Sequence, residues 1–191
     1  MARSKTFDPQ LALLKAMTVF WEQGYTATSI QDLVEAMGIH RGSLYDTFQD
    51  KRQLFLQAIA LYQDTVVQAA ISHLKAPGAS RTAIEHHFWQ LAEHPVEQPC
   101  GCLITNTLVE LAPEDEELVA VLSQGLQQVE DAFFQALVRA QDQGEIPAHQ
   151  DIRTLAHYLT TSLQGLRVMS RLQPHADSLR PTIQLILKAL D

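Results

Sequence analysis

The chain has 191 residues, of which 46% are apolar, and it carries a formal net charge of −8 at neutral pH. This size is sufficient for one large hydrophobic core or two small ones. No run of eighteen or more apolar residues occurs, so a membrane span is not expected. The first ten residues lack the apolar stretch of a secretory signal, and Cys100 and Cys102 are too close to link distant segments. We therefore expect a cytoplasmic protein.

The charge is unevenly distributed along the chain. Residues 1–56 contain six Lys or Arg and six Asp or Glu, so the net negative charge falls on the remaining residues. The acidic total argues against indiscriminate binding to nucleic acid. It leaves room for a neutral N-terminal region that reads DNA locally.

The first two expected helices are marked by residues typical of helix ends. Asp8 followed by Pro9 predicts the start of a helix that ends at Gly24. Thr28, with Gln31 three residues later, predicts a capping box at the start of the second helix. Both segments carry apolar residues at the three- and four-residue spacing of one helix face. We therefore predict two short amphipathic helices before residue 38.

The stretch "MGIHRGSLYDTFQDK" follows and predicts a glycine turn with a short polar helix. Its apolar positions are few, namely Ile39, Leu44 and Phe48. Two short helices separated by a glycine turn are typical of a helix-turn-helix, and such a helix fits a major groove. The residues predicted to contact DNA there are His40, Arg41, Gly42, Ser43, Tyr45 and Asp46. Thr28 and Lys51 are predicted to contact phosphates.

Helix signals continue to the end of the chain, and no strand pattern appears. The later helices are expected at residues 50–75, 80–93, 101–112, 113–144, 151–172 and 178–190. The fold class is therefore all-α, with about nine helices. Residues 1–50 are expected to form a helix-turn-helix DNA-binding domain. Residues 51–191 are expected to form a larger helical ligand-binding and dimerisation domain.

The segment "TSIQDLVEAMGIHRGSLYDTFQDKRQLF" resembles the DNA-binding signature of the TetR/AcrR family of bacterial transcriptional regulators. The resemblance covers about residues 10–56 closely. It implies a homodimer that binds a palindromic operator in double-stranded DNA, commonly as a repressor, and is released by a small-molecule inducer. His40, Val34 and Thr47 depart from the usual Ser or Thr, Ala and aromatic residue, which leaves the operator sequence open.

Apolar stripes on the last two expected helices predict the dimer interface, although an internal core is the alternative. The predicted interface residues are Leu155, Leu159, Leu163, Leu166, Ile183, Ile186, Leu187 and Leu190. Aromatic, thiol and amide side chains in the larger domain are candidates for the ligand site, or plain core. These candidates are Trp89, Cys100, Cys102, Asn106, Phe133 and Tyr158.

The pair Cys100 and Cys102 suggests an alternative regulator that senses electrophiles or oxidants through thiols. Buried structural cysteines are the competing interpretation. Consecutive histidines point about 100° apart on a helix, so no metal site is expected from His86, His87 and His94. An enzyme is not expected, because no nucleophile elbow, phosphate loop or HExxH motif occurs. A cysteine enzyme using Cys100 with His94 or His157, or a helical adaptor, remains a weaker alternative. No cofactor is expected.

Overall fold

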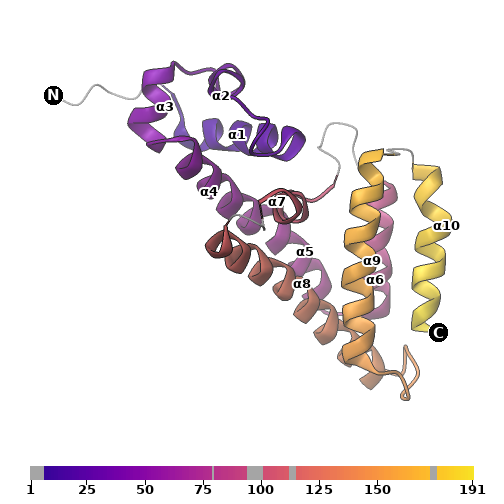
Figure 1. The fold of residues 1–191 in the computed structure, drawn as a ribbon. Helices are drawn as coiled ribbons and strands as arrows, with labels where there is room; N and C mark the ends of the chain where they lie inside the picture. Colours follow the sequence, from indigo (N-terminus) through magenta and orange to yellow (C-terminus); the bar gives the residue numbers. More distant parts are fainter. Residues whose placement is uncertain (1–6, 79, 94–100, 112–114, 173–175) are drawn as a thin grey trace.

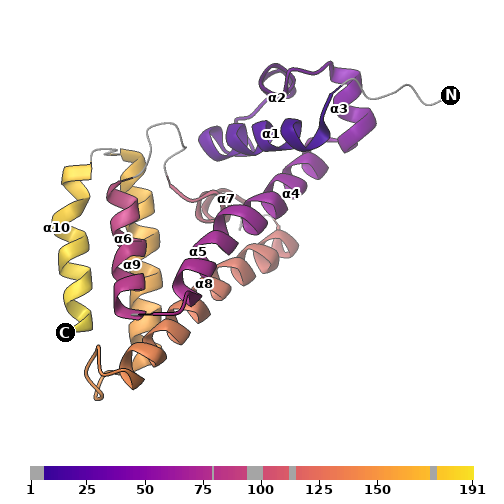
Figure 2. The same ribbon diagram turned by 180° about the vertical axis from the view of Figure 1, so that it is seen from behind.

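A computed structural model of the chain describes residues 7–78, 80–93, 101–111, 115–172 and 176–191. These residues form helices and connecting turns, and no strand occurs among them (Figures 1 and 2). The elements are α1 (Pro9–Gln23), α2 (Ile30–Met37), α3 (Arg41–Phe48), α4 (Lys51–Tyr62), a π-helical segment (Gln63–Val67), α5 (Gln68–Lys75), α6 (Ser80–Ala92), α7 (Leu103–Leu111), α8 (Glu116–Asp142), α9 (Ile152–Leu172), α10 (Ala176–Leu187) and a 3₁₀ turn (Lys188–Leu190). The all-α prediction with about nine helices is confirmed, counting α4, the π-helical segment and α5 as one continuous helix.

The three N-terminal helices form a small head around the start of α4 (Figure 1). Phe20, Leu33, Leu44 and Phe55 are at most 1% exposed and make its core. Burial of these side chains supplies the main stabilisation, because each contributes about 1.5–3 kcal/mol relative to exposure.

The caps of the head helices follow the sequence pattern with one shift. The Asp8 carboxylate accepts a hydrogen bond from the Gln10 amide at 2.8 Å, as expected for the N-cap of α1. The capping box of α2 uses Ser29 and Asp32 rather than Thr28 and Gln31. The prediction was therefore wrong by one residue, because adjacent residues of suitable type compete for both positions of the box.

A continuous helix from residue 51 to residue 75 connects the head to the larger helical region (Figures 1 and 2). By length and composition it could cross a membrane. Within this protein it packs against α1 near its start and against α6 and α8 near its end. The π-helical segment in its middle widens the helix at the level of α7 and α8.

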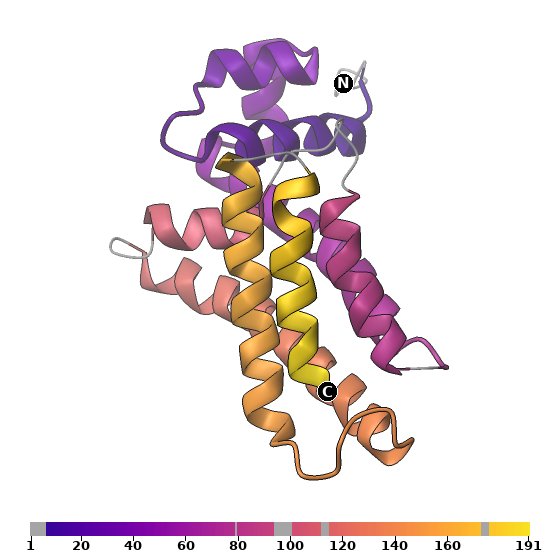
Figure 3. The same ribbon diagram turned by 90° about the vertical axis from the view of Figure 1, so that its right-hand side faces the viewer.

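The larger region is built from α6, α8, α9 and α10, with α9 and α10 side by side (Figure 3). The eight residues predicted for the dimer interface are at most 9% exposed in one chain, so they pack inside this region. Their burial favours the alternative of an internal core, because a side chain covered by its own chain has little surface left for a partner; their part in a dimer interface stays a prediction. The apolar side chains that remain exposed on the same two helices are Tyr158, Val168, Met169, Leu172 and Leu185.

Candidate DNA-reading face and ligand pocket

The short helix α3 is fixed by its apolar side and presents its polar side outward. Leu44 is fully buried and Phe48 is 2% exposed, so both anchor α3 in the head. Gly38 makes the turn before α3 at a φ of 68°, a conformation that glycine adopts without steric cost. The outward residues are His40, Arg41, Gly42, Tyr45 and Asp46, while Ser43 is half-buried. The structure thus places all six predicted residues on one short helix and its N-cap.

Two features distinguish the exposed end of α3. His40 occupies the N-cap, but its side chain makes no hydrogen bond to the helix amides. These amides therefore lack a side-chain cap from His40 and can be offered to a phosphate. The Arg41 guanidinium lies 3.4 Å from the Tyr45 hydroxyl and 5.8 Å from the centre of its ring. Arg41 and Tyr45 therefore form one exposed polar unit on the outer face.

The two residues predicted to contact phosphates outside α3 are engaged within the protein. Thr28 is 1% exposed, and its hydroxyl donates to the Gly24 carbonyl at 2.5 Å. The structure corrects the prediction for Thr28, since a buried hydroxyl with a protein acceptor is not offered to DNA. The Lys51 ammonium is half-buried and lies 4.4 Å from the centre of the Tyr25 ring. Burial lowers the pKa of Lys51 despite the nearby Glu110 carboxylate. A phosphate contact by Lys51 stays a prediction.

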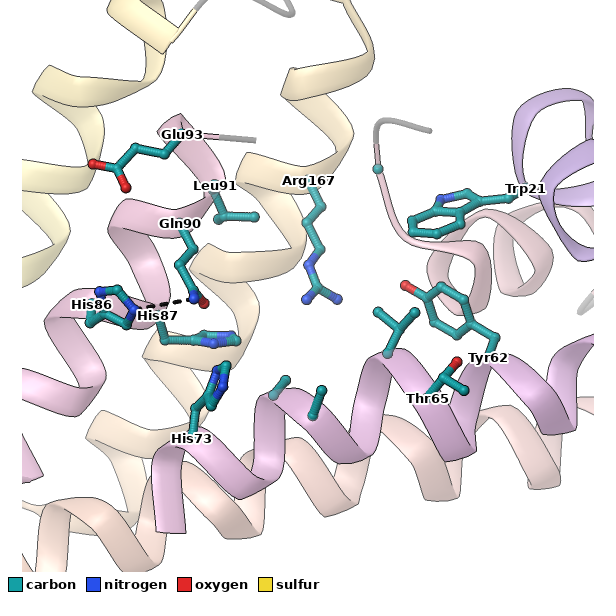
Figure 4. A pocket seen from close by; sticks show the side chains of 14 residues that line it. Trp21, Tyr62, Thr65, His73, His86, His87, Gln90, Leu91, Glu93 and Arg167 are labelled. Atoms are coloured by element: carbon teal, nitrogen blue, oxygen red, sulfur yellow. Dashed lines mark hydrogen bonds between the residues drawn. The ribbon is translucent and has the colours of Figure 1, made fainter. Parts of the chain in front are cut away.

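A pocket of about 610 Å³ lies between the head and the larger region (Figure 4). Its walls come from α1, the continuous helix 51–75, α6, α9 and Gly101 just before α7. Arg167 projects into the space with His87 on one side and Tyr62 on the other, and Trp21 lies beyond Tyr62 (Figure 4). The pocket therefore touches the N-terminal head, through Trp21, as well as the larger region.

His87 is a strongly perturbed titratable group in the pocket wall. It is 6% exposed, and burial, together with the charge of Arg167, lowers its pKa to about 3. Both of its ring nitrogens are buried without a hydrogen-bond partner in the described part of the chain. The ring packs edge-on against Phe133, with centres 5.7 Å apart. His87 is therefore a neutral imidazole with unused polar atoms at the pocket.

The depressed pKa of His87 predicts that acid weakens the fold. The unfolded chain binds a proton at His87 below about pH 6.5, whereas the folded chain does so only near pH 3. The contribution to stability is therefore complete above pH 6.5 and is lost as the pH falls through this window. For His87 alone the loss between pH 7 and pH 4 is at most roughly 3 kcal/mol.

Urea unfolding between pH 4 and pH 7 measures this effect. The free energy of unfolding of His87→Gln should depend less on pH than that of the wild type. His149→Gln, which changes an exposed histidine outside the pocket lining, should keep the wild-type dependence. Identical pH profiles for His87→Gln and the wild type would contradict the assignment.

Cys102 lies directly behind the pocket wall, next to Gly101. It is 1% exposed and does not line the pocket. Burial alone would raise the pKa of the Cys102 thiol, but the Arg167 guanidinium and hydrogen bonds from Thr105 and Tyr62 lower it on balance. Burial and the neighbouring Cys102 raise the pKa of the Tyr62 hydroxyl, so Tyr62 stays protonated. Cys102 thus forms one polar cluster with Tyr62 and Arg167 of the pocket wall.

The residues predicted to bind ligand do not line this pocket. Phe133 is fully buried in the core, Tyr158 is 40% exposed on α9, and Trp89 packs partly buried against the core. Asn106 lies on α7, outside the lining, with its amide nitrogen buried and unpartnered. Cys100 lies outside the described residues. A role in ligand binding stays a prediction for these residues, and their position favours the alternative interpretation of core or surface, because residue type alone does not distinguish a pocket wall from core.

Sequence reasoning missed the lining residues Trp21, Tyr62 and Arg167. One signal was present: Arg167 follows the buried Leu163 by four residues, so a cation interrupts the apolar stripe of α9. Trp21 carried no such signal, because nothing in the sequence relates α1 to α6 and α9. His86, His87 and His94 had been considered together for metal. His94 lies outside the described residues, and no group of metal-binding side chains occurs among the described ones.

A carboxylate on α7 connects this region to the head. Glu110 accepts hydrogen bonds from the amides of Tyr25 at 3.0 Å and Thr26 at 2.6 Å. Burial opposes ionisation of Glu110, but these hydrogen bonds and Lys51 lower its pKa on balance. A Cβ on Gly24 would lie 2.7 Å from Glu110, so glycine allows this close approach. The turn between α1 and α2 is therefore tied to the helix that begins at the pocket wall.

An all-helical chain with an exposed short helix after a glycine turn, and a pocket in a second helical region, defines a helix-turn-helix regulator with a candidate ligand site. Residues 12–58 match the family model described as bacterial regulatory proteins, tetR family. Residues 78–186 match the model described as tetracyclin repressor-like, C-terminal domain. The chain belongs to the TetR family of bacterial transcriptional regulators, a family of DNA-binding proteins and not of enzymes.

Relatives of known sequence and structure agree with this assignment. The chain is 39% identical to the uncharacterized HTH-type transcriptional regulator YezE of Bacillus subtilis strain 168, over all of both chains. It is 34% identical to the HTH-type transcriptional repressor ComR of Escherichia coli strain K12, over 88% of this chain and 82% of ComR. A cysteine variant of the TetR family regulator CifR, complexed with a 26 bp double-strand operator DNA, superimposes with a TM-score of 0.89 at 28% identity over all of both chains.

Proposed function

We propose that the protein is a ligand-responsive transcriptional repressor that binds a palindromic operator as a homodimer and is released by a small molecule. The observation that carries the proposal is the pocket between the N-terminal head and the larger region, which includes Trp21 of α1 in its wall. A ligand in such a pocket contacts both parts of the molecule at once. Two relatives support the DNA-binding part: CifR is complexed with operator DNA, and ComR is named a repressor.

The exposed apolar side chains of α9 and α10 support the homodimer. Residues 158, 165, 168, 169 and 172 lie on one face of α9, where Gly165 leaves room for close approach. Leu185 is 67% exposed on the neighbouring α10. Large exposed apolar side chains gathered on adjacent helices are typical of an interface. A two-fold pairing of this surface would give each dimer two copies of α3, as a palindrome requires.

Two connections can carry the effect of a ligand to α3. Trp21 lies in the pocket and belongs to α1, which packs on α2. The second connection consists of hydrogen bonds at the end of α1. The Glu110 carboxylate accepts from the Tyr25 and Thr26 amides, and the Arg171 guanidinium donates to the Glu22 carbonyl at 3.0 Å. A ligand that binds the two head positions with different affinities shifts their populations by that difference. It would thereby change the separation of the two α3 helices in a dimer.

A thiol-based sensor is the second candidate function. Arg167 beside Cys102 favours the thiolate form, which reacts with electrophiles. Against this, Cys102 is 1% exposed, so a reagent cannot reach it without a rearrangement. We therefore favour reversible binding in the pocket over reaction at Cys102. Localisation in the cytoplasm, where the chromosome lies, is part of the proposal.

A reporter assay tests the repressor role. The operator, obtained by selection from random DNA, is placed between promoter and reporter gene in a bacterium without this protein. Expression of the protein should lower reporter output, and a scrambled operator should abolish the effect. In a second reporter the operator is placed upstream of the promoter. A rise in reporter output when the protein is expressed, with either operator position, would identify an activator and overturn the repressor assignment.

A further inference from the structure

The pocket contains polar groups that lack partners in the described part of the chain. His87 is 6% exposed, and neither of its ring nitrogens is hydrogen-bonded. The indole nitrogen of Trp21 is also buried and unpartnered. The Arg167 guanidinium donates to the Cys102 sulfur but forms no ion pair with a carboxylate of the described residues. Buried polar groups are normally hydrogen-bonded, so several donors left open around one cavity indicate a missing acceptor.

The opposite wall of the pocket has small apolar side chains at its centre. Residues 62, 65, 66, 69, 70 and 73 line it, and their spacing puts them on one face of the continuous helix 51–75. Val66, Ala69 and Ala70 are apolar, while Thr65 and His73 are polar. Ala69 and Ala70 leave space where larger residues would close the cavity. A volume of about 610 Å³ holds at most roughly twenty non-hydrogen atoms, at the ~30 Å³ that a water occupies in the liquid.

The charge of the lining favours a ligand with a single negative charge. Arg167 supplies the one permanent cation, His87 is neutral at physiological pH, and His73 and His86 are the other histidines in the wall. The Glu93 carboxylate also lines the pocket, at its exposed rim. A ligand with two or three negative charges would therefore meet one cation and one anion. A guanidinium matches a carboxylate in geometry, since two parallel N–H groups can donate to its two oxygens.

We propose that the pocket binds a small monocarboxylic acid with an apolar or aromatic body. The carboxylate pairs with Arg167, and the body lies between the alanine-lined face of helix 51–75 and Trp21. This assignment names the ligand class for the function proposed above and rests on that function. Because Trp21 is part of α1, the ligand contacts the DNA-reading head directly.

Tryptophan fluorescence gives a readout for binding that needs no DNA. The chain has two tryptophans, so Trp89→Phe leaves Trp21 as the single reporter in the pocket. This variant is titrated with hexanoate, octanoate, benzoate and phenylacetate, and with the corresponding uncharged amide of each. We expect at least one acid to change the fluorescence of Trp21 at a concentration roughly ten- to a hundred-fold lower than its amide, as for a hydrogen bond to a charged group.

Two arginine variants on α9, made in the Trp89→Phe background, test the contact. Arg167→Met should remove the preference for the acid over its amide. Arg153→Met changes an exposed arginine at the other end of the same helix and should keep that preference. Arg167→Lys retains the charge without the planar fork, so it should bind the acid with intermediate affinity. Circular dichroism and thermal unfolding establish that each variant is folded.

The outcomes separate this assignment from the proposed function. Equal affinity for acids and amides, a preference that survives in Arg167→Met, or no binding of any of the four acids would overturn the monocarboxylate assignment. Operator binding is measured on the same preparations without ligand. If the wild-type protein does not bind the operator in the absence of ligand, the proposed function is overturned, whether or not the acids bind.

Discussion

Replacing Tyr45 with alanine should lower the affinity for the operator by roughly five- to a hundred-fold, while helical content stays unchanged. Tyr45 is 39% exposed on the outer face of α3, so its removal leaves no cavity in the head. Arg41→Ala should have an effect of similar size, because its guanidinium reaches the Tyr45 hydroxyl and lies on the same face. Fluorescence anisotropy with a labelled operator measures both affinities at a stated salt concentration.

Matched variants separate the possible causes of such a loss. Tyr45→Phe removes only the hydroxyl and therefore tells hydrogen bonding from contact by the ring. Val109→Ala changes a side chain on α7 that is 79% exposed, and it should leave operator affinity unchanged. An Arg41→Ala protein with wild-type operator affinity and sequence preference would show that this face of α3 does not read the bases.

Glutamate at Val168 and Leu185 together should produce monomers and lower operator affinity by roughly 10²–10⁴-fold. The two side chains are 44% and 67% exposed on α9 and α10, so the substitution spares the core of one chain. In the proposed dimer, four carboxylates would be buried without partners at the interface, which is strongly unfavourable. The loss in affinity arises because two linked heads bind two half-sites far more tightly than one head binds one.

Sedimentation and operator binding on the same samples test this expectation. Val109→Glu introduces a carboxylate at an exposed valine of α7 and should remain dimeric. Leu163→Asp is not a suitable test, because Leu163 is fully buried within one chain and its substitution would destabilise the fold. A wild-type protein that sediments as a monomer at micromolar concentration would contradict the dimer.

The short helix α3 could be predicted from the sequence because its signals are local. A glycine turn, two apolar anchors and a run of polar residues lie within fifteen positions, and Leu44 and Phe48 are buried as their spacing predicts. The prediction placed the capping box one residue too early, because several neighbouring residues in this segment are of a type that can cap a helix. The local sequence therefore predicts that a helix begins here more reliably than it predicts the exact residue at which the helix begins.

The pocket and the exposed apolar face of α9 and α10 could not be predicted from the sequence, for two physical reasons. The pocket walls come from helices that are distant in the chain, and no spacing rule relates Trp21 to His87 or Arg167. On α9, apolar residues occur on both sides: Leu163 faces the core, while Val168 is exposed. The periodicity identifies an apolar face but does not tell which of two such faces the chain itself covers.

Selection of bound fragments from a random pool of DNA tests the central claim most directly, when combined with the mass of the resulting complex. We expect the enriched fragments to contain an inverted repeat whose half-sites are centred about 34–36 Å apart, or a multiple of this distance along the duplex. The mass of the complex should correspond to an even number of bound chains, two or more per fragment. The Arg41→Ala variant should enrich fragments with relaxed sequence in both half-sites equally. Enrichment of a single unrepeated site by one chain, or no enrichment of any sequence, would contradict the account.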